Sequence, residues 1–388
     1  MPDFILILLL AAFPALSTDM YLPAIPTLCT LWNIPLAQAN LSLVVFFVTF
    51  SSFLLIHGPL SDRFGRRPVL LWGILLFIAG SLLCAASQSI TTLVAARAVQ
   101  AVGAAAASAL SFALAKDMYT GEQRKKLLAY IGVIVPLCPM AAPTIGAFML
   151  QHVSWRGIFV LQGALALFAL YGAFRLREPL TSKASGGAAA ALKRYVTLFS
   201  NAPFMVYAVA FALPGLAFFA FIAGSSNIYI SGFGSSEQQY GLYFAFNAFS
   251  LMLGSFLCSR LCVGLASRTI LFVSFVGMLL SVLAMFVFGN ETPVSFAVTM
   301  FCYTMFLGMS RPISNHMILE QVDRNAGAAA SLVTFFFFLC GAVAMETISL
   351  QWDSKPFVIA VLGGAGTVAA LGVTLMLRGR SAEKPATS

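Results

Sequence analysis

The feature that most constrains this chain is a succession of long apolar segments along its whole length. Of its 388 residues, 60% are hydrophobic and 9% are charged, whereas a soluble domain carries about 25% charged residues. A helix needs about 20 apolar residues to cross the hydrocarbon core of a bilayer. A chain within that core must satisfy its backbone hydrogen bonds internally. We therefore predict an all-α membrane protein.

Twelve segments are long and apolar enough to span a membrane, and short polar loops separate them. The predicted spans are residues 4–26, 40–60, 68–87, 90–115, 127–150, 157–175, 203–229, 239–261, 269–288, 293–318, 328–349 and 356–377. The chain starts Met1-Pro2-Asp3, without a basic segment. The first apolar run is therefore predicted to stay in the membrane and not to be a cleaved signal peptide.

Lysine and arginine are distributed unevenly between the loops on the two sides. If the N-terminus is cytoplasmic, the loops and tail on that side hold 18 of the 22 basic residues, and the outer loops hold only Arg156 and Lys355. Cytoplasmic loops of membrane proteins carry such an excess of positive charge. We therefore predict that both termini are cytoplasmic. The net charge of +9 then reflects membrane topology and not nucleic-acid binding.

The longest polar segment lies in the middle of the chain and predicts two halves. The predicted domains are an N-terminal six-helix bundle (1–175), a cytoplasmic linker (176–202), a C-terminal six-helix bundle (203–377) and a cytoplasmic tail (378–388). Leu60-Ser61-Asp62-Arg63 after the second span is echoed by Leu257-Cys258-Ser259-Arg260 after the eighth. Equal halves with an internal echo fit a duplicated, pseudo-symmetric transporter.

The loop between the second and third spans is rich in glycine and charge. It reads Gly58-Pro59-Leu60-Ser61-Asp62-Arg63-Phe64-Gly65-Arg66-Arg67-Pro68. The two glycines permit unusual backbone dihedrals, and an aspartate is favoured at a helix N-terminus. A plain basic turn between two spans is the alternative interpretation, but the spacing is richer than such a turn requires.

This loop resembles the G-x-L-x-D-R-x-G-R-R/K signature of the major facilitator superfamily and matches it at each signature position. The resemblance implies the major facilitator fold, with an eleventh helix that begins near Asp62. It also implies a conformational gate, whose acidic partner Asp117 stands at the inner end of the fourth span. The gating residues implied are Gly58, Asp62, Arg63, Gly65, Arg66, Arg67 and Asp117.

Arg97 lies inside the fourth predicted span. A charge at that depth costs about 2.5–3.5 kcal/mol on insertion scales, so an arginine without a role is unexpected there. The segment Arg97-Ala98-Val99-Gln100-Ala101-Val102-Gly103 is similar to the family's fourth-helix motif, R-x-x-Q-G-x-G, with Ala101 at the first glycine. The alternative is a structural arginine that pairs only with backbone carbonyls.

The fifth predicted span contains three prolines, Pro136, Pro139 and Pro143, followed by Gly146. Each proline removes a helical hydrogen bond and can kink the helix. The segment Ala142–Ala147 resembles the G-P-x-x-G-G core of the family's antiporter motif, with alanine at both outer glycines. Gly132 fits the motif upstream. This resemblance implies exchange of substrate for protons, and a merely kinked helix is the alternative.

Asp19 stands about seven residues from the predicted outer end of the first span, as Arg97 does in the fourth. At ~1.5 Å per residue both lie ~10 Å deep, so they are predicted to share one cavity. The segment from Asp19 to Pro26 resembles the Bcr/CflA-type branch of bicyclomycin, chloramphenicol and florfenicol resistance proteins. We assign proton coupling to Asp19 and Arg97. The predicted cavity residues are Asp19, Tyr21, Arg97, Gln100, Asn227, Tyr243 and Asn247.

Other polar residues in the spans are given structural roles. Glu346 is predicted to lie at the rim of the eleventh span, and Arg311 and His316 to extend from the tenth span towards the inner interface. The seven cysteines form no CxxC pair, so neither a metal site nor a disulfide framework is predicted.

The resemblance implies proton-coupled efflux of small, partly apolar drugs such as amphenicol-like or bicyclomycin-like antibiotics across a bacterial inner membrane. Transport of a native metabolite such as a nucleoside or cysteine is the alternative. An enzyme is not expected, since the three histidines are separated and no HExxH occurs. No GxxxxGK[ST] loop for ATP is present either. The expected partners are the transported molecule, protons and the lipid bilayer, and the chain is expected to be a monomer without cofactor.

Overall fold

The computed structural model describes residues 2–180, 188–322 and 325–382, and these parts contain helices and no strand. The first helices are α1 (Pro2–Asp19), η1 (Leu22–Ala24), α2 (Ile25–Trp32), α3 (Leu36–Phe64), α4 (Arg66–Ala86), α5 (Ile90–Met118), α6 (Gly121–His152) and α7 (Trp155–Arg175). After α8 (Ala188–Phe199) follow α9 (Ala202–Ala212), α10 (Gly215–Ser226), η2 (Asn227–Gly232), α11 (Glu237–Leu261), α12 (Ser267–Phe288), α13 (Pro293–Leu319), α14 (Ala326–Ser349) and α15 (Lys355–Ala382).

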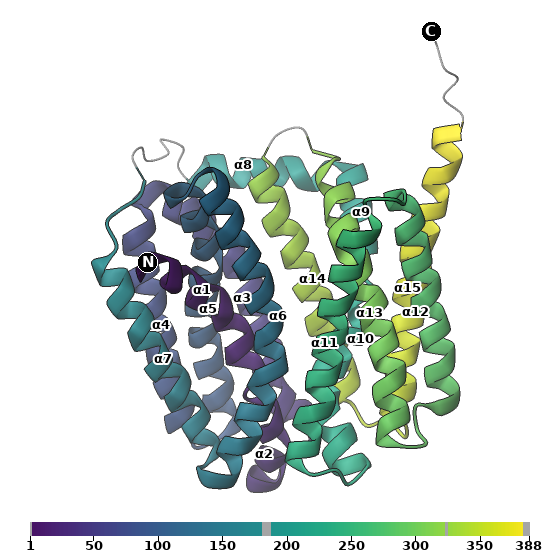
Figure 1. The fold of residues 1–388 in the computed structure, drawn as a ribbon. Helices are drawn as coiled ribbons and strands as arrows, with labels where there is room; N and C mark the ends of the chain where they lie inside the picture. Colours follow the sequence, from purple (N-terminus) through teal and green to yellow (C-terminus); the bar gives the residue numbers. More distant parts are fainter. Residues whose placement is uncertain (1, 181–187, 323–324, 383–388) are drawn as a thin grey trace.

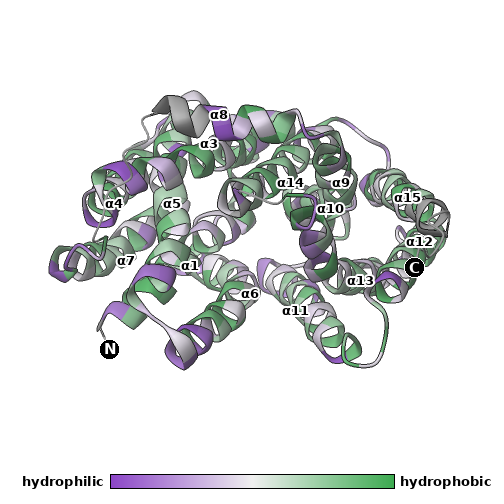
Figure 2. Cartoon of the chain, turned by 90° about the horizontal axis from the view of Figure 1, so that it is seen from above, coloured by the Kyte–Doolittle hydropathy of each residue, from purple (hydrophilic) through white to green (hydrophobic). Residues whose placement is uncertain are grey.

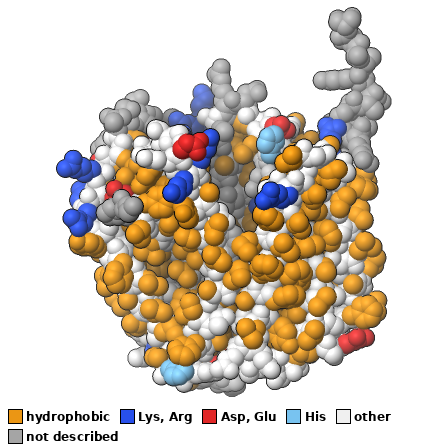
Figure 3. Space-filling model, in the orientation of Figure 1, with side chains coloured by type: hydrophobic (Ala, Val, Ile, Leu, Met, Phe, Trp, Pro, Cys, Tyr) orange, Lys and Arg blue, Asp and Glu red, His pale blue; other side chains and the backbone are white. Residues whose placement is uncertain are grey.

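The described residues form twelve helical segments long and apolar enough to cross a membrane, which confirms the all-α, twelve-span prediction. The first such segment runs over Asp3–Trp32 and the seventh over Ala202–Gly232. The predicted end of the first span at residue 26 is wrong, because α2 continues the helical segment to Trp32. In Figure 3 hydrophobic side chains cover the middle of the visible face, and charged side chains gather towards its ends, as a bilayer requires.

Two of the spans are interrupted, and prolines explain both breaks. Pro23 has no N–H to donate to the carbonyl of Asp19, so α1 ends at Asp19 and the chain passes through η1 into α2. Pro214 likewise separates α9 from α10. The first and the seventh span therefore each contain a helix end inside the bundle, where backbone carbonyls lack helical donors.

The spans form two groups, α1–α7 and α9–α15, which lie side by side in Figures 1 and 2. Neighbour relations repeat between them: the pairs α3–α5, α4–α7 and α1–α6 correspond to α11–α13, α12–α15 and α10–α14. The groups meet mainly where α3 contacts α14 and α6 contacts α11. The domain limits at 176–202 and 378–388 remain predictions, and residues 181–187 and 383–388 of these segments lie outside the described residues.

One end of the bundle carries α8, the loop from Asp62 to Arg67 and the end of α15, and we call it the basic end (top of Figure 1). Figure 2 views this end, with α8 along the side of the bundle next to α3, α9 and α14. The Tyr195 hydroxyl of α8 donates a hydrogen bond to the Leu55 carbonyl of α3 at 2.9 Å. We predict that the basic end faces the cytoplasm. Three of the basic residues on which this prediction rests, Lys183, Arg324 and Lys384, lie outside the described residues.

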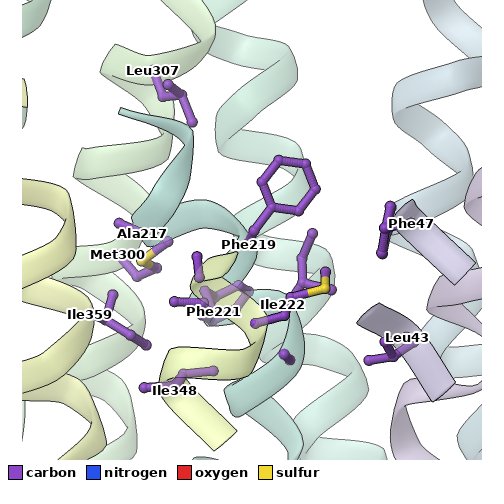
Figure 4. Close-up of a cluster of buried hydrophobic side chains, with 14 of the residues drawn as sticks. Leu43, Phe47, Ala217, Phe219, Phe221, Ile222, Met300, Leu307, Ile348 and Ile359 are labelled. Carbon is purple, nitrogen blue, oxygen red and sulfur yellow. The ribbon is translucent and has the colours of Figure 1, made fainter. Parts of the chain in front are cut away.

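Aromatic and aliphatic side chains fill the contact between the two groups. Figure 4 shows Phe219 and Ile222 of α10 facing Leu43 and Phe47 of α3. The rings of Phe47 and Phe219 lie 5.6 Å apart in an edge-on arrangement, and Phe338 of α14 stacks on Phe47 at 5.3 Å. Edge-to-face and offset pairs of this kind contribute about 0.5–1.5 kcal/mol beyond the burial of their surface.

Hydrogen bonds close the contact at the end opposite to the basic end. The buried Asn40 amide of α3 donates to the Ala223 carbonyl at 3.0 Å and to the Ser349 hydroxyl at 2.7 Å. Gln238 of α11 donates to Gln151 of α6 at 3.0 Å. The opposite end is thus sealed between the groups by hydrogen bonds of neutral side chains.

The basic end is open between the two groups by comparison. There α3, α5, α8 and the start of α14 surround a cavity of about 260 Å³. In Figure 1 α6 and α11 approach each other towards the opposite end and diverge towards the basic end, and Figure 3 shows the surface hollowed between them there. The structure therefore represents a state in which the interior faces the basic end.

Candidate transport site

Asp19 is the last residue of α1 and lies inside the bundle with 5% of its surface exposed. Its Oδ1 accepts a hydrogen bond from the Thr18 hydroxyl at 3.0 Å. The next residue, Met20, packs on Gly146 of α6, and the following η1 contacts both α6 and α11. Among the described residues, no cation lies within ion-pair distance of Asp19. The carboxylate is therefore placed where α1, α6 and α11 meet, without a neutralising partner.

Arg97 of α5 is fully buried and binds the end of α1. Its Nη1 donates to the Ser17 carbonyl at 3.0 Å and to Oε1 of Gln100 at 2.5 Å, and its Nε points to the Ser42 carbonyl at 3.5 Å. The carbonyls at a helix C-terminus carry partial negative charge and lack helical donors. Arg97 therefore satisfies the backbone of the break that holds Asp19.

Aromatic rings enclose the same guanidinium. The ring centroid of Phe46 lies 4.2 Å from its central carbon, and those of Tyr21 and Phe159 lie at 5.3 and 5.8 Å. Such cation–π contacts offset part of the cost of a buried charge, by about 0.5–2 kcal/mol. Arg97 and Asp19 make no ion pair, although their side chains belong to neighbouring parts of one site. In this state Tyr21, Arg97 and Gln100 have no exposed surface and so do not line an open cavity.

A second amide, that of Gln162, extends the network and was not identified from the sequence. Gln100 donates through Nε2 to the Ser81 hydroxyl and to Oε1 of Gln162, both at 2.8 Å. Gln162 of α7 in turn donates to the Leu16 carbonyl at 3.1 Å. In the sequence, Gln162 is the one glutamine of the apolar sixth span, and burying an amide without hydrogen bonds there would cost free energy. This feature could have identified it. The end of α1 is thus held by side chains from both α5 and α7.

The predicted cavity residues of the second group lie in different places. Asn227 begins η2 and accepts a hydrogen bond from the Lys355 ammonium near the opposite end. Tyr243 stacks on Tyr229 with ring centroids 4.7 Å apart. The Nδ2 atom of Asn247 is buried and has no hydrogen-bond partner. Tyr243 and Asn247 both lie on α11, the helix that also carries Tyr240.

The signature loop forms a compact ion-pair cluster at the basic end. Arg66 pairs with Asp62 at 2.6 Å through Nη1 and with Asp117 at 2.8 Å through Nε. Its Nη1 also donates to the Ser61 hydroxyl at 2.6 Å. The start of α14 lies across the 260 Å³ cavity from Asp62, since residues 325, 327 and 328 line that cavity too. Arg63 instead lies against the ring of its neighbour Phe64 at 5.1 Å.

Glu178 completes this cluster and was not identified from the sequence. Its carboxylate accepts the backbone N–H groups of Arg66 at 2.9 Å and of Arg67 at 3.0 Å, and so caps the N-terminus of α4. Gly65 adopts a positive φ of 108°, and a Cβ at this position would lie 2.7 Å from the Glu178 carboxylate. A glycine is therefore needed both for the backbone conformation and for the approach of Glu178.

We expect Glu178→Gln to lower the thermal unfolding midpoint of the purified protein. The substitution removes a negative charge from the N-terminus of α4, where an anion contributes about 0.3–1 kcal/mol. The matched control is Glu320→Gln, which removes an acid from an exposed i,i+4 pair with His316 at the C-terminus of α13, away from any helix N-terminus. Pairs of this kind contribute little, so its midpoint should stay at the wild-type value. Equal midpoints for both variants would contradict the capping role of Glu178.

The residues of the antiporter-like segment differ in their surroundings. Gly146 of α6 packs directly on the backbone of Met20, next to Asp19, and a Cβ there would overlap the Met20 carbonyl group. Pro143 is buried in an unbroken α6, and Pro139 is half-buried. Gly132 has nothing within 4 Å of the position that a Cβ would take. Gly146 therefore contacts the candidate site directly, whereas Gly132 has no close neighbour.

Comparisons with known proteins agree with this architecture. The family model of the Major Facilitator Superfamily matches residues 7–345. An uncharacterized MFS-type transporter of Bacillus subtilis (strain 168), YdgK, is 30% identical over 92% of this chain and 92% of that protein. A bicyclomycin resistance protein homolog of Haemophilus influenzae is 27% identical over 95% of this chain and 94% of that protein.

A solved structure has the same fold. The crystal structure of a D-xylose-proton symporter superposes with a TM-score of 0.74 at 16% sequence identity, over 95% of this chain and 96% of that one. This likeness concerns the fold alone. With the family model matched over most of the chain, the protein belongs to the major facilitator superfamily, and is a multi-pass membrane transporter and not an enzyme.

Proposed function

We propose that this transporter exports small, partly apolar drugs across the bacterial inner membrane in exchange for protons. The observation that carries the proposal is Asp19, an acid inside a membrane span without a cationic partner among the described residues. Ionisable residues in such positions mark substrate and proton pathways. The drug class is supported by the bicyclomycin resistance protein homolog among its relatives and by the segment from Asp19 to Pro26.

The proposed cycle alternates access between the two ends of the bundle. In the state described, hydrogen bonds close the opposite end, and a drug enters from the basic end towards Asp19. The two groups of helices then rock about the site, which opens to the opposite end. A proton that binds Asp19 there neutralises it and displaces the drug. Return to the first state releases the proton to the cytoplasm.

The roles of the other predicted residues follow from their contacts. Arg97 and Gln100 hold the break at the end of α1, and so position Asp19 without touching the drug in this state. The cluster of Asp62, Arg66 and Asp117 ties α3 and α4 to α5 at the basic end. We propose that it stabilises the alternate state by closing on the start of α14.

The membrane potential contributes to the energy of the proposed exchange. Each unit charge that moves across 100 mV releases ~2.3 kcal/mol.

Growth and flux measurements test this function. Cells that lack their own drug exporters and express the chain should tolerate higher bicyclomycin or chloramphenicol concentrations than cells with an empty vector. Proteoliposomes with an imposed proton gradient should move the same drug, and a protonophore should stop the movement. If neither drug is moved while a nucleoside or cysteine is moved in a protonophore-sensitive manner, the protein is a metabolite transporter. Drug movement that a protonophore leaves unchanged would remove proton coupling.

A further inference from the structure

A second arginine inside the membrane, Arg311 of α13, has no role in the site described so far. It lies eight residues before the end of α13 at Leu319, or ~12 Å along a helix. The prediction that its side chain extends to the inner interface is wrong. The central carbon of its guanidinium lies 3.8 Å from the ring centroid of Phe337 in α14, and its Nη1 points to the Phe211 carbonyl of α9. The guanidinium therefore points into the second group of helices.

The break in the seventh span explains this direction. Pro214 separates α9 from α10 and leaves carbonyls in the last turn of α9 without helical donors. Phe211 belongs to that turn, and its carbonyl accepts the Nη1–H of Arg311 at 3.5 Å. Arg311 thus has a structural role at the break. Its hydrogen bond to the Phe211 carbonyl is nevertheless longer than the ~2.7–3.2 Å usual for N–H···O bonds, so this role uses the guanidinium only weakly.

Most of the hydrogen-bonding capacity of Arg311 is left over. A guanidinium carries five N–H donors in a planar fork, and the contact with Phe211 uses one of them. No carboxylate among the described residues lies within ion-pair distance of Arg311. The nearest acid along α14, Glu346, is nine residues from Phe337, ~14 Å along the helix. By contrast, Arg97 has two close acceptors on one nitrogen and three aromatic neighbours.

The remaining donors of Arg311 have no acceptor among the described residues. The Nη1 of Arg97, by contrast, has close acceptors on α1 and α5. Arg311 as a whole is half-buried. A half-buried cation kept inside a membrane span at a cost of about 2.5–3.5 kcal/mol, with donors that no described residue uses, is suited to bind an anionic group that enters the protein.

We propose that Arg311, held over the face of Phe337, forms an anion-binding position in the second group of helices, and that it takes the carboxylate of a small molecule with an apolar body. Two parallel N–H···O bonds fit a guanidinium to a carboxylate, which a point charge such as lysine does not reproduce. The proposal goes beyond the proposed function and rests on it for transport. To neutral drugs such as chloramphenicol and bicyclomycin it adds a second class of transported molecule, which carries one carboxylate beside an apolar body.

A matched pair of fluorescent probes tests the position directly. Dansylglycine and dansylglycinamide share an apolar body and differ in the carboxylate, and their fluorescence reports binding to the full-length protein in nanodiscs. Wild-type protein should bind the acid at least about tenfold more tightly than the amide. Arg311→Gln keeps a donor for the Phe211 carbonyl and should bind both probes equally. Arg311→Lys should retain only a part of the preference.

The control for loss of one positive charge is Arg260→Gln. Arg260 is exposed at the end of α11 and lies over the ring of Phe256, so this variant should keep the wild-type preference. Equal affinities in the wild type, an unchanged preference in Arg311→Gln, or no binding of either probe would each overturn the proposal. If Arg311→Gln does not assemble, Arg311→Lys decides, and full wild-type preference in that variant overturns the bidentate site. Failure of drug export with the probe preference intact would refute the export function alone.

Discussion

Replacing Asp19 with asparagine is expected to abolish proton release on drug binding, while part of the drug binding remains. Asparagine keeps the size of the side chain and its acceptor oxygen towards the Thr18 hydroxyl. It cannot exchange a proton. Because Asp19 is the acid placed where α1, α6 and α11 meet and has no cation beside it, we expect no other group to replace it in coupling.

The measurement is the pH change when chloramphenicol or bicyclomycin is added to purified protein in weak buffer. Wild-type protein should release protons in proportion to the drug bound. Asp353→Asn is the matched control, because it makes the same change at an exposed residue between α14 and α15. Proton release at the wild-type level from Asp19→Asn would exclude Asp19 as the coupling acid. Glu346, with one buried oxygen that has no partner, would then be the next acid to substitute.

The fold was predictable because the bilayer restricts the answer. Twelve apolar segments in a chain with little charge leave helices as the structure that satisfies the backbone in lipid. The limits of the spans were harder to predict. The first span ends at Trp32 and not at residue 26, since Pro23 and Pro26 mark a break inside the span and not its end.

The charged residues of the site were predictable to the extent that burial of a charge is costly. Asp19, Arg97 and Arg311 stand out in apolar segments, so their importance follows from composition alone. The direction of a side chain does not follow from composition. The Arg311 side chain points to Phe337 inside the bundle and not to the surface. Glu178 was missed because it lies beyond the sixth span and caps α4 from 112 positions away in the chain. Gln162 was missed because a neutral amide in a helix is a weak signal.

Replacing Gly146 with alanine is expected to reduce transport by at least about tenfold. A Cβ at this position would overlap the carbonyl oxygen of Met20 and lie 2.9 Å from its carbon. These are backbone atoms, so no change of rotamer can make room, and α6 must move away from the end of α1. Overpacking of this kind typically costs about 1–3 kcal/mol. Because α6 also contacts α11 near the opposite end, we expect the closure there to loosen.

The readout is the accessibility of the opposite end. A cysteine in place of Ser349, which is buried between the two groups at that end beside Asn40, should react slowly with a membrane-impermeant maleimide in the wild-type background and several times faster with Gly146→Ala. Gly132→Ala is the control on the same helix, because nothing lies within 4 Å of the added methyl group, and it should leave both transport and labelling unchanged. If Gly146→Ala behaves like Gly132→Ala, α6 does not seal the site by contact with Met20. The resemblance to the antiporter motif would then reflect helix bending by Pro139 and Pro143, and the test would move to those prolines.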